Sequence, residues 1–177
     1  DLAACGARPL AFTLALSLPR ADSAWCQAFS TGLLALADDH DCELIGGDTT
    51  QGPLNICITV LGEVPANLAI LRSGAKVGDD IYVSGTLGDA RLALLALQGQ
   101  LQVPASVLAS TRIRLEQPTP RVALGLALRG IASAAADVSD GLLGDLGHIL
   151  ERSGVGATVH TGDATNLIAA YANSQDI

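Results

Sequence analysis

The chain of 177 residues carries 18 acidic and 10 basic side chains, a formal net charge of −8 and a hydrophobic content of 49%. This balance disfavours proteins that bind nucleic acids or anionic membranes through a basic surface, and no apolar run reaches the roughly 20 residues of a membrane-spanning helix. The length suffices for one sizeable domain or two small ones. Phosphate ligands remain compatible with an acidic chain when divalent cations lie between its carboxylates and the ligand oxygens.

Cysteine usage favours a reducing compartment. The four cysteines form no CxxC pair and the three histidines are scattered, which predicts buried free thiols in place of disulfides or a zinc site. The chain begins at Asp1, contains no methionine and shows no charged-then-apolar signal segment. We therefore expect a piece of a longer cytoplasmic protein.

The first elements in chain order are a strand and a helix. Residues 10–18 are mostly apolar, which predicts a strand, and Pro19 ends it. Asp22 or Ser23 can cap a helix that continues to about Asp39. The apolar side chains that share one face of this helix at helical spacing are Trp25, Phe29, Leu33, Leu34 and Ala37.

A glycine pair followed by an acidic residue comes next. Residues 42–45 predict a short buried strand that stops at Gly46 and Gly47, where the absence of Cβ atoms permits a sharp turn or a close approach. Asp48 and two threonine hydroxyls then place hard oxygen ligands on a strand-end loop. A binding loop and a polar turn that only caps the strand are both compatible with this stretch. Alternation of apolar and polar residues predicts a further strand over residues 54–64.

A connecting segment separates two units. We assign residues 1–66 to a first α/β domain, 67–76 to a connector and 77–177 to a second domain. The connector holds Arg72 and Lys76, two of the ten cations of the chain. Both can face solvent, but in a glycine-containing connector they are also well placed to contact phosphate oxygens.

The second unit is expected to combine short strands with several helices. Residues 81–84 predict a strand, which a glycine-rich loop joins to the next helix. Prolines delimit two of the later helices. The helices predicted in this unit are residues 90–99, 104–115, 121–131 and 166–171, and a further short strand is predicted at 157–160.

A second acidic cluster repeats the pattern of the first. A small apolar run ends at Asp137, and Ser139 and Asp140 follow across a strand-to-helix turn. Ser139 or Asp140 can cap the helix that follows, with Asp145 as a favourable charge at its positive end. Alternatively, this loop and the loop of Asp48 are the two separated acidic loops that a multi-cation nucleotide site needs.

Six stretches along the chain carry a family resemblance. They are DLAACGARP (1–9), LIGGDTTQG (44–52), RSGAKVGD (72–79), YVSGTLGD (82–89), PTPR (118–121) and DVSDGL (137–142). In this order they resemble the thiamine-monophosphate kinase family, part of the superfamily that also contains aminoimidazole-ribotide synthetase, selenophosphate synthetase and a hydrogenase-maturation protein. Each stretch alone is a weak signal, but six in register are specific. The motifs Gly-Gly-Asp-Thr-Thr and Ser-Asp-Gly-Leu favour the kinase over its relatives.

The resemblance implies a two-domain α/β protein of α+β type with the aminoimidazole-ribotide synthetase-like fold. It implies a homodimer formed through the first domain, with ATP and several Mg²⁺ ions in clefts across the dimer. The implied reaction transfers the γ-phosphoryl group of ATP to the phosphate of thiamine monophosphate and yields thiamine diphosphate. Because the attacking phosphate is already anionic, positioning and charge neutralisation should matter more than a general base.

The resemblance also implies roles for individual residues. The implied magnesium ligands are Asp1, Asp48, Asp137 and Asp140, and the residues implied to lie at the ATP are Gly47, Asp48, Arg72 and Ser139. We assign no catalytic side chain. The sequence has no Ser-His-Asp order or nucleophile elbow, and His148 is expected to pack or to face solvent.

The chain departs from the family by omission. The N-terminal Gly-Asp-Asp and thiamine-phosphate-contacting segments of the family would precede Asp1, and its Gly-Gly-Glu-Asp motif would follow Ile177. We therefore expect a first domain truncated at its N-terminus, a second truncated at its C-terminus, and no activity from these 177 residues alone. Conversion of thiamine monophosphate by the purified 177-residue chain would contradict that expectation.

Two alternatives to the kinase stay open from the sequence. Another ATP-dependent member of the superfamily would share these motifs, because the missing ends are where substrates are distinguished. A non-catalytic nucleotide-binding scaffold would keep the fold and the dimer interface without the reaction. In all three cases the expected partners are ATP and a second copy of the chain, with thiamine monophosphate for the kinase, and neither nucleic acid nor membrane.

Overall fold

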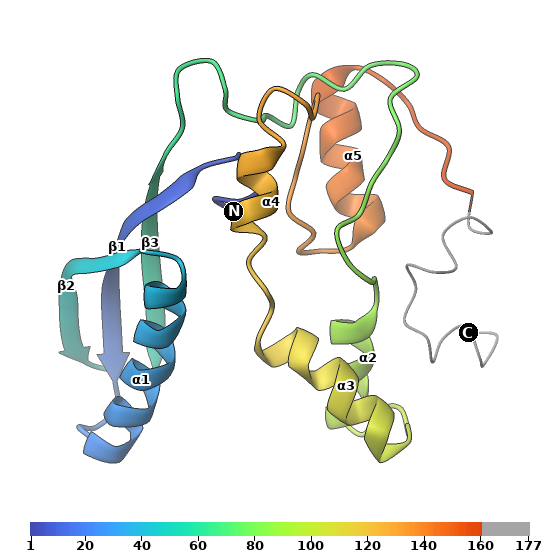
Figure 1. Ribbon diagram of the computed structural model, residues 1–177. Helices are drawn as coiled ribbons and strands as arrows, with labels where there is room; N and C mark the ends of the chain where they lie inside the picture. The colour runs from blue at the N-terminus through green and yellow to red at the C-terminus, as the bar shows by residue number, and fades with distance from the viewer. Residues whose placement is uncertain (161–177) are drawn as a thin grey trace. The chain divides into compact units, whose positions relative to one another are not determined.

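The computed structural model describes residues 1–160, along which eight helices and strands follow one another (Figure 1). The contacts divide the chain into two units. The first holds Asp1–Ile70 and Val122–Ile131, and the second holds Leu71–Arg121 and the chain from Ala132 onward. The helix predicted at residues 166–171 lies outside the described residues. No helix among the described residues is long and apolar enough to cross a membrane.

The first unit is built on a three-stranded sheet. Its strands are β1 (Arg8–Leu18), β2 (Glu43–Gln51) and β3 (Asn55–Glu63), in the order β2-β1-β3. β1 pairs in parallel with β2 and antiparallel with β3, so a tight turn joins β2 to β3 across the central strand. The predicted strands at residues 10–18 and 54–64 are confirmed.

Helix α1 (Ser23–Asp39) connects the two parallel strands, as βαβ connections require. It begins where predicted, because the Asp22 carboxylate accepts a hydrogen bond from the Trp25 N–H at 3.1 Å. The Trp25 and Phe29 rings stack with centroids 5.0 Å apart. Ala37 is buried, but Leu34, which was expected on the apolar face, is 41% exposed.

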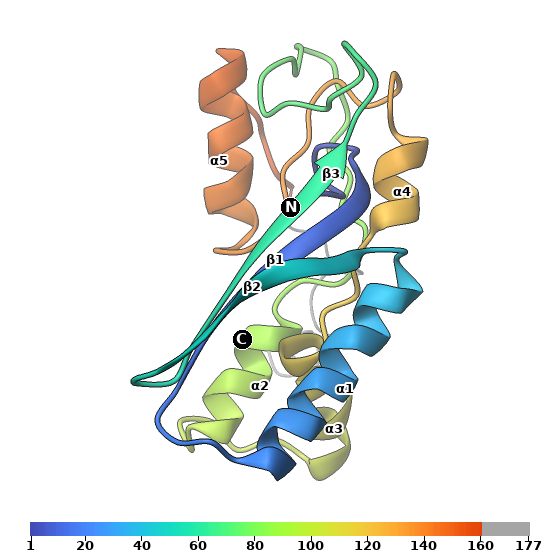
Figure 2. The same ribbon diagram turned by 90° about the vertical axis from the view of Figure 1, so that its left-hand side faces the viewer.

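The core of the first unit lies against the central strand. Phe12 and Leu16 of β1 are buried, as are Ala37 of α1 and Ile70 at the end of the unit's first segment. Figure 2 shows α1 on one side of the sheet, where the end of the helix leads into β2. The edge strand β3 is exposed along its whole length.

Helix α4 (Val122–Ala127) belongs to the first unit although it comes late in the sequence. Gly125 lies so close to the N-terminal turn that a Cβ atom there would stand 2.1 Å from the Ala3 carbonyl oxygen. Arg129, just after the helix, donates from Nε to the Gly6 carbonyl oxygen at 2.6 Å. The sequence had placed this segment in the second domain. These long-range contacts are what attach it to the first unit.

The second unit consists of α2 (Asp89–Leu97), α3 (Ala105–Glu116) and α5 (Leu142–Ser153), joined by extended segments. Helices α2 and α3 pack together. The predictions of helices at residues 90–99 and 104–115 are confirmed. The predicted fourth helix, residues 121–131, is shorter, because α4 ends at Ala127.

Two predicted strands of the second unit are absent. Residues 81–84 and 157–160 are irregular, and within residues 71–160 only Leu87 makes an isolated bridge. A strand is defined by its hydrogen bonds to a neighbouring strand, and the described part of this unit offers no neighbour. The apolar composition of residues 81–84 and 157–160 therefore predicted strands, but these residues do not pair into a sheet within the described part of the chain.

Candidate functional site

The Gly-Gly-Asp motif lies inside a strand and not on a loop after it. The predicted strand end at residue 45 is wrong, because β2 continues through the motif to Gln51. Its pairing with β1 shifts by one residue between Phe12 and Thr13, so Ile45 is an extra residue opposite the central strand. The bulge lets the strand continue where a glycine pair was expected to end it.

Gly47 allows β2 to pass very close to β1. It has φ of +146°, and a Cβ atom built there would lie 1.9 Å from the Leu14 carbonyl oxygen. At Gly46 a Cβ atom would meet nothing within 4 Å. The two glycines therefore differ: Gly47 is required by the close approach, and Gly46 is not.

Asp48 follows Gly47 and is paired with Ala15 of β1. Its Oδ1 accepts a hydrogen bond from the Thr49 N–H at 2.8 Å, and the residue is exposed. The strand pairing thus holds the backbone of Asp48 firmly while its carboxylate remains at the surface. A hard anionic oxygen presented in this way suits Mg²⁺.

Asp1 is the other predicted magnesium ligand in the first unit. It is exposed, and its carbonyl oxygen accepts from the Cys5 N–H at 3.3 Å. The turn that it begins is closed by a hydrogen bond of 2.8 Å from the Ala7 N–H to the Leu2 carbonyl oxygen. Asp1 therefore stands at the start of a well-ordered turn.

The loop of Asp137, Ser139 and Asp140 precedes α5 in the second unit. Asp137 is half-buried, and Ser139 and Asp140 are exposed. Neither Ser139 nor Asp140 caps the helix, contrary to the first interpretation of this loop, because the N-cap residue is Gly141 and no side chain caps it.

Asp145 holds this loop from inside the helix. The residue is only 6% exposed, and its Oδ2 accepts from the N–H groups of Ser139 at 2.9 Å and Asp140 at 3.1 Å. The sequence had treated Asp145 as a charge near the helix start. The sequence did hold a signal for this role. Asp145 lies one turn after the helix start, and the N-cap residue there is a glycine, so the carboxylate of Asp145 is the nearby group that can bind free N–H groups of the preceding loop.

Arg72 lies in a segment of the second unit that several bonds fix in place. Its carbonyl oxygen accepts from the Ser153 hydroxyl at 3.2 Å, and its side chain is exposed.

Asp79, further along the same segment, accepts hydrogen bonds from the Ser133 hydroxyl and the Lys76 N–H. These two hydrogen bonds, the one from Ser133 first, lower the pKa of Asp79 below its ordinary value.

The predicted site residues fall into two groups. Gly47, Asp48 and Asp1 lie in the first unit, and Arg72, Asp137, Ser139 and Asp140 lie in the second. Among residues 1–160, no three or more histidine, cysteine, aspartate or glutamate side chains converge to hold a metal ion. The donor chemistry fits Mg²⁺, since every predicted ligand is an aspartate, and Asp1, Asp48 and Asp140 are exposed.

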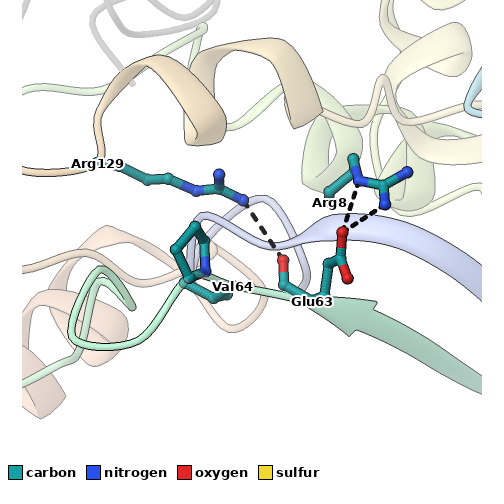
Figure 3. Close-up of a pocket in the computed structure, with 5 residues that line it drawn as sticks. Arg8, Glu63, Val64 and Arg129 are labelled. Atoms are coloured by element: carbon teal, nitrogen blue, oxygen red, sulfur yellow. Dashed lines mark hydrogen bonds and ion pairs between the residues drawn. The ribbon is translucent and has the colours of Figure 1, made fainter.

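A hollow of about 250 Å³ lies in the first unit, and none of the predicted site residues lines it (Figure 3). Its lining consists of Arg8, Glu63, Val64, Pro65 and Arg129. Arg8 donates from Nε to Glu63 Oε1 at 3.0 Å, and Arg129 donates to the Glu63 carbonyl oxygen at 3.4 Å. The sequence analysis missed this group, although opposite charges at the paired ends of antiparallel strands could have indicated the ion pair.

Two family models match the chain. One, described as AIR synthase related protein, N-terminal domain, matches residues 1–64, and the other, the C-terminal domain of the same family, matches residues 76–174. Thiamine-monophosphate kinase of Salmonella typhimurium is 54% identical over 160 residues, which are 90% of this chain and 49% of the relative. That of Haemophilus influenzae is 49% identical over 180 residues, covering 99% of this chain and 53% of the relative. The chain thus spans about half the length of these curated relatives.

Solved structures share the fold. The crystal structure of thiamine-monophosphate kinase from Stenotrophomonas maltophilia is 57% identical, with a TM-score of 0.82, and the match covers 87% of this chain and 50% of that one. The structure of AaThiL complexed with AMPPCP and TMP is 30% identical, with a TM-score of 0.79, and the match again covers 87% and 50%. The fold class predicted from the sequence is confirmed by these matches.

Proposed function

This chain belongs to the AIR synthase related protein family, and from that premise we propose that it forms part of a thiamine-monophosphate kinase. The proposed reaction transfers the γ-phosphoryl group of ATP to the phosphate of thiamine monophosphate. The observation that carries the proposal is the 54% identity over 90% of the chain to a relative of that name. The structural match to AaThiL, which was solved with AMPPCP and TMP, supports ATP and thiamine monophosphate as the two substrates.

We assign binding roles, and no acid–base role, to the residues of this chain. Asp1, Asp48, Asp137 and Asp140 would hold several Mg²⁺ ions, which supply charge neutralisation at the phosphates when bound. The other contacts to ATP would come from Gly47, Arg72 and Ser139. Gly47 lets β2 stay close to β1 beside Asp48, and the Arg72 guanidinium has the shape and charge to bind phosphate oxygens. Such residues act by positioning an anionic nucleophile and screening its repulsion from ATP.

We also propose that two copies of the protein associate through the first unit. The β3 side chains Ile56, Ile58 and Val60 remain 44%, 46% and 38% exposed, although their partners on β1 include the buried Phe12 and Leu16. An apolar stripe on an edge strand favours an interface, and a second copy of the chain is its proposed occupant. Cytoplasmic localisation is proposed as well, because ATP and a reducing environment for four free cysteines are both found there.

The dimer is tested by Ile58→Asp in the full-length gene product. We expect light scattering to show a shift from dimer to monomer, because a carboxylate would be buried in the interface. Thr59→Asp is the matched control, since the neighbouring residue of a strand points to the opposite face. A wild-type monomer, or a dimer that survives Ile58→Asp, would contradict this part of the proposal.

The nucleotide site is tested by Asp48→Asn. The proposal predicts that Mg²⁺-dependent ATP binding weakens by at least about tenfold, because a ligand charge is lost beside the phosphates. Glu43→Gln, an exposed acidic residue on the same strand, should leave binding unchanged. Unaltered binding by Asp48→Asn would favour the non-catalytic scaffold. Turnover of another acceptor in preference to thiamine monophosphate would favour a different ATP-dependent member of the superfamily.

A further inference from the structure

We propose that helix α5 carries two positioning residues, Asp145 near its start and Ser153 at its end, which hold the backbones of two nucleotide-binding loops. One loop carries Ser139 and Asp140, and the other carries Arg72. The inference rests on the proposed function for what these loops bind. The contacts that hold them are properties of the chain itself and can be tested without any ligand.

Asp145 acts on the first loop through a buried carboxylate. Only 6% of the residue is exposed, and one oxygen, Oδ2, accepts from both the Ser139 and the Asp140 N–H groups. A buried carboxylate is costly unless hydrogen-bond donors satisfy it, and charge-assisted bonds to N–H groups are among the stronger hydrogen bonds in proteins. The position in the first turn of α5 adds the favourable field of the helix N-terminus. Asp145 therefore binds the loop backbone through Oδ2, and we assign it this role in place of a magnesium ligand.

Ser153 acts on the second loop in the same way at the other end of the helix. Its Oγ accepts from the Gly74 and Ala75 N–H groups, each at 3.1 Å, and donates to the Arg72 carbonyl oxygen at 3.2 Å. One hydroxyl thus makes three hydrogen bonds to the backbone of a single short segment that has no regular structure. The alternative for these backbone groups is water, which would leave the loop free to move.

A second set of contacts restrains the Arg72 loop from its other side. A Cβ atom at Gly74 would lie 2.4 Å from the Ser133 carbonyl oxygen, so the two backbones are in close contact. The Ala135 N–H donates to the Leu71 carbonyl oxygen at 3.0 Å. The loop is therefore held between Ser153 and the segment that leads towards Asp137.

The helix fixes the distance between the two anchors, and each anchor holds its own loop. Asp145 and Ser153 are eight positions apart, which corresponds to about 12 Å along the axis of a helix. Binding groups must be held to within roughly 0.5 Å of their working positions, and misplacement by about 1 Å can reduce catalysis a hundredfold. Neither Asp145 nor Ser153 is assigned a contact with ATP or Mg²⁺. Both would act through the loops, which defines them as positioning residues.

The test compares Asp145→Asn, Ser153→Ala and Ser153→Thr in the full-length gene product, with Glu151→Gln as a control on the exposed side of the same helix. Amide hydrogen exchange without ligand is the first measurement. Asp145→Asn should speed exchange at Ser139 and Asp140 only, and Ser153→Ala should speed it at Gly74 and Ala75 only. Glu151→Gln should change neither pair.

Steady-state kinetics with ATP and Mg²⁺ are the second measurement. Asp145→Asn should raise the Mg²⁺ concentration needed for half-maximal rate by at least about tenfold, because it releases the loop of Asp140. Ser153→Ala should raise KM for ATP several-fold with a smaller effect on kcat, and Ser153→Thr should restore it, since threonine keeps the hydroxyl. If the two residues had a purely structural role, both variants would lower stability, and neither would selectively change the Mg²⁺ requirement or the KM for ATP.

The outcomes separate this inference from the proposed function. Unchanged exchange at both loops, or kinetic effects no larger than those of Glu151→Gln, would overturn the inference. A wild-type protein that does not phosphorylate thiamine monophosphate would overturn the proposed function, and the exchange data would then still decide whether α5 holds the loops. If Asp145→Asn does not fold, Ser153→Ala decides the question, because it leaves no buried charge without a partner.

Discussion

A single methyl group at Gly47 should disrupt the pairing of β1 and β2 beside Asp48. The Cβ atom of Gly47→Ala would lie 1.9 Å from the Leu14 carbonyl oxygen and 2.7 Å from its carbonyl carbon. Reaching the 3.4 Å of an ordinary contact from 1.9 Å requires the strands to separate by about 1.5 Å. The φ of +146° adds strain, because residues with a side chain rarely adopt it.

Both effects have known magnitudes. Overpacking costs about 1–3 kcal/mol and backbone strain about the same, so Gly47→Ala should lower the free energy of unfolding by roughly 2–6 kcal/mol. This is a large share of the roughly 5–15 kcal/mol that stabilises a typical domain. Affinity for ATP with Mg²⁺ should fall as well, since Asp48 is the next residue and pairs with Ala15 of the displaced strand.

Gly46→Ala is the matched control, one residue earlier in the same strand. Its Cβ atom meets nothing within 4 Å, so its stability should stay within about 1 kcal/mol of the wild type. Both variants are measured by urea-induced unfolding and by titration with an ATP analogue and Mg²⁺. Equal stability of Gly47→Ala and Gly46→Ala would refute the reasoning, because only Gly47 lies against the neighbouring backbone.

Three further changes test other parts of the structure. Gly125→Ala should destabilise the protein by about 1–3 kcal/mol in urea-induced unfolding, because its Cβ atom would lie 2.1 Å from the Ala3 carbonyl oxygen; wild-type stability would show that α4 does not pack there. Asp22→Ala removes the side-chain cap of α1 and should cost about 1 kcal/mol, measured as a lower Tm. The lowered pKa of Asp79 stabilises the fold at pH values above its ordinary 3.8, and this contribution is lost as the pH falls through the lower folded value. Ser133→Ala should therefore reduce the loss of stability on acidification below pH 3.8, and an identical pH profile would contradict that role.

Predictions that depend on neighbours in the sequence succeeded. Asp22 caps α1 because a capping bond spans three residues, and Pro19 ends β1 because proline cannot continue the pairing. The alternation at residues 54–64 identified β3 for the same reason. The six short motifs also placed the chain in the superfamily of aminoimidazole-ribotide synthetase, and the AIR synthase related models that match residues 1–64 and 76–174 confirm that placement.

Predictions that depend on a distant partner failed or were absent. The end of β2 was placed at residue 45 because a glycine pair usually breaks a strand, whereas pairing with β1 carries the strand to Gln51. Residues 81–84 were assigned to a strand although no neighbouring strand is described there. The attachment of α4 to the first unit depends on Gly125 and Arg129 meeting residues more than 100 positions earlier.

The sequence by itself determined the AIR synthase related family and supplied the aspartates that we propose as magnesium ligands, because motif order and side-chain type are local information. The tertiary structure decided how those aspartates are supported. It showed that Gly47 lies against the Leu14 backbone, that Asp145 faces inward to two N–H groups, and that Ser153 binds the loop of Arg72. These contacts join segments that packing and hydrogen bonding bring close together in the folded chain. No short sequence pattern indicates which segments will meet in this way.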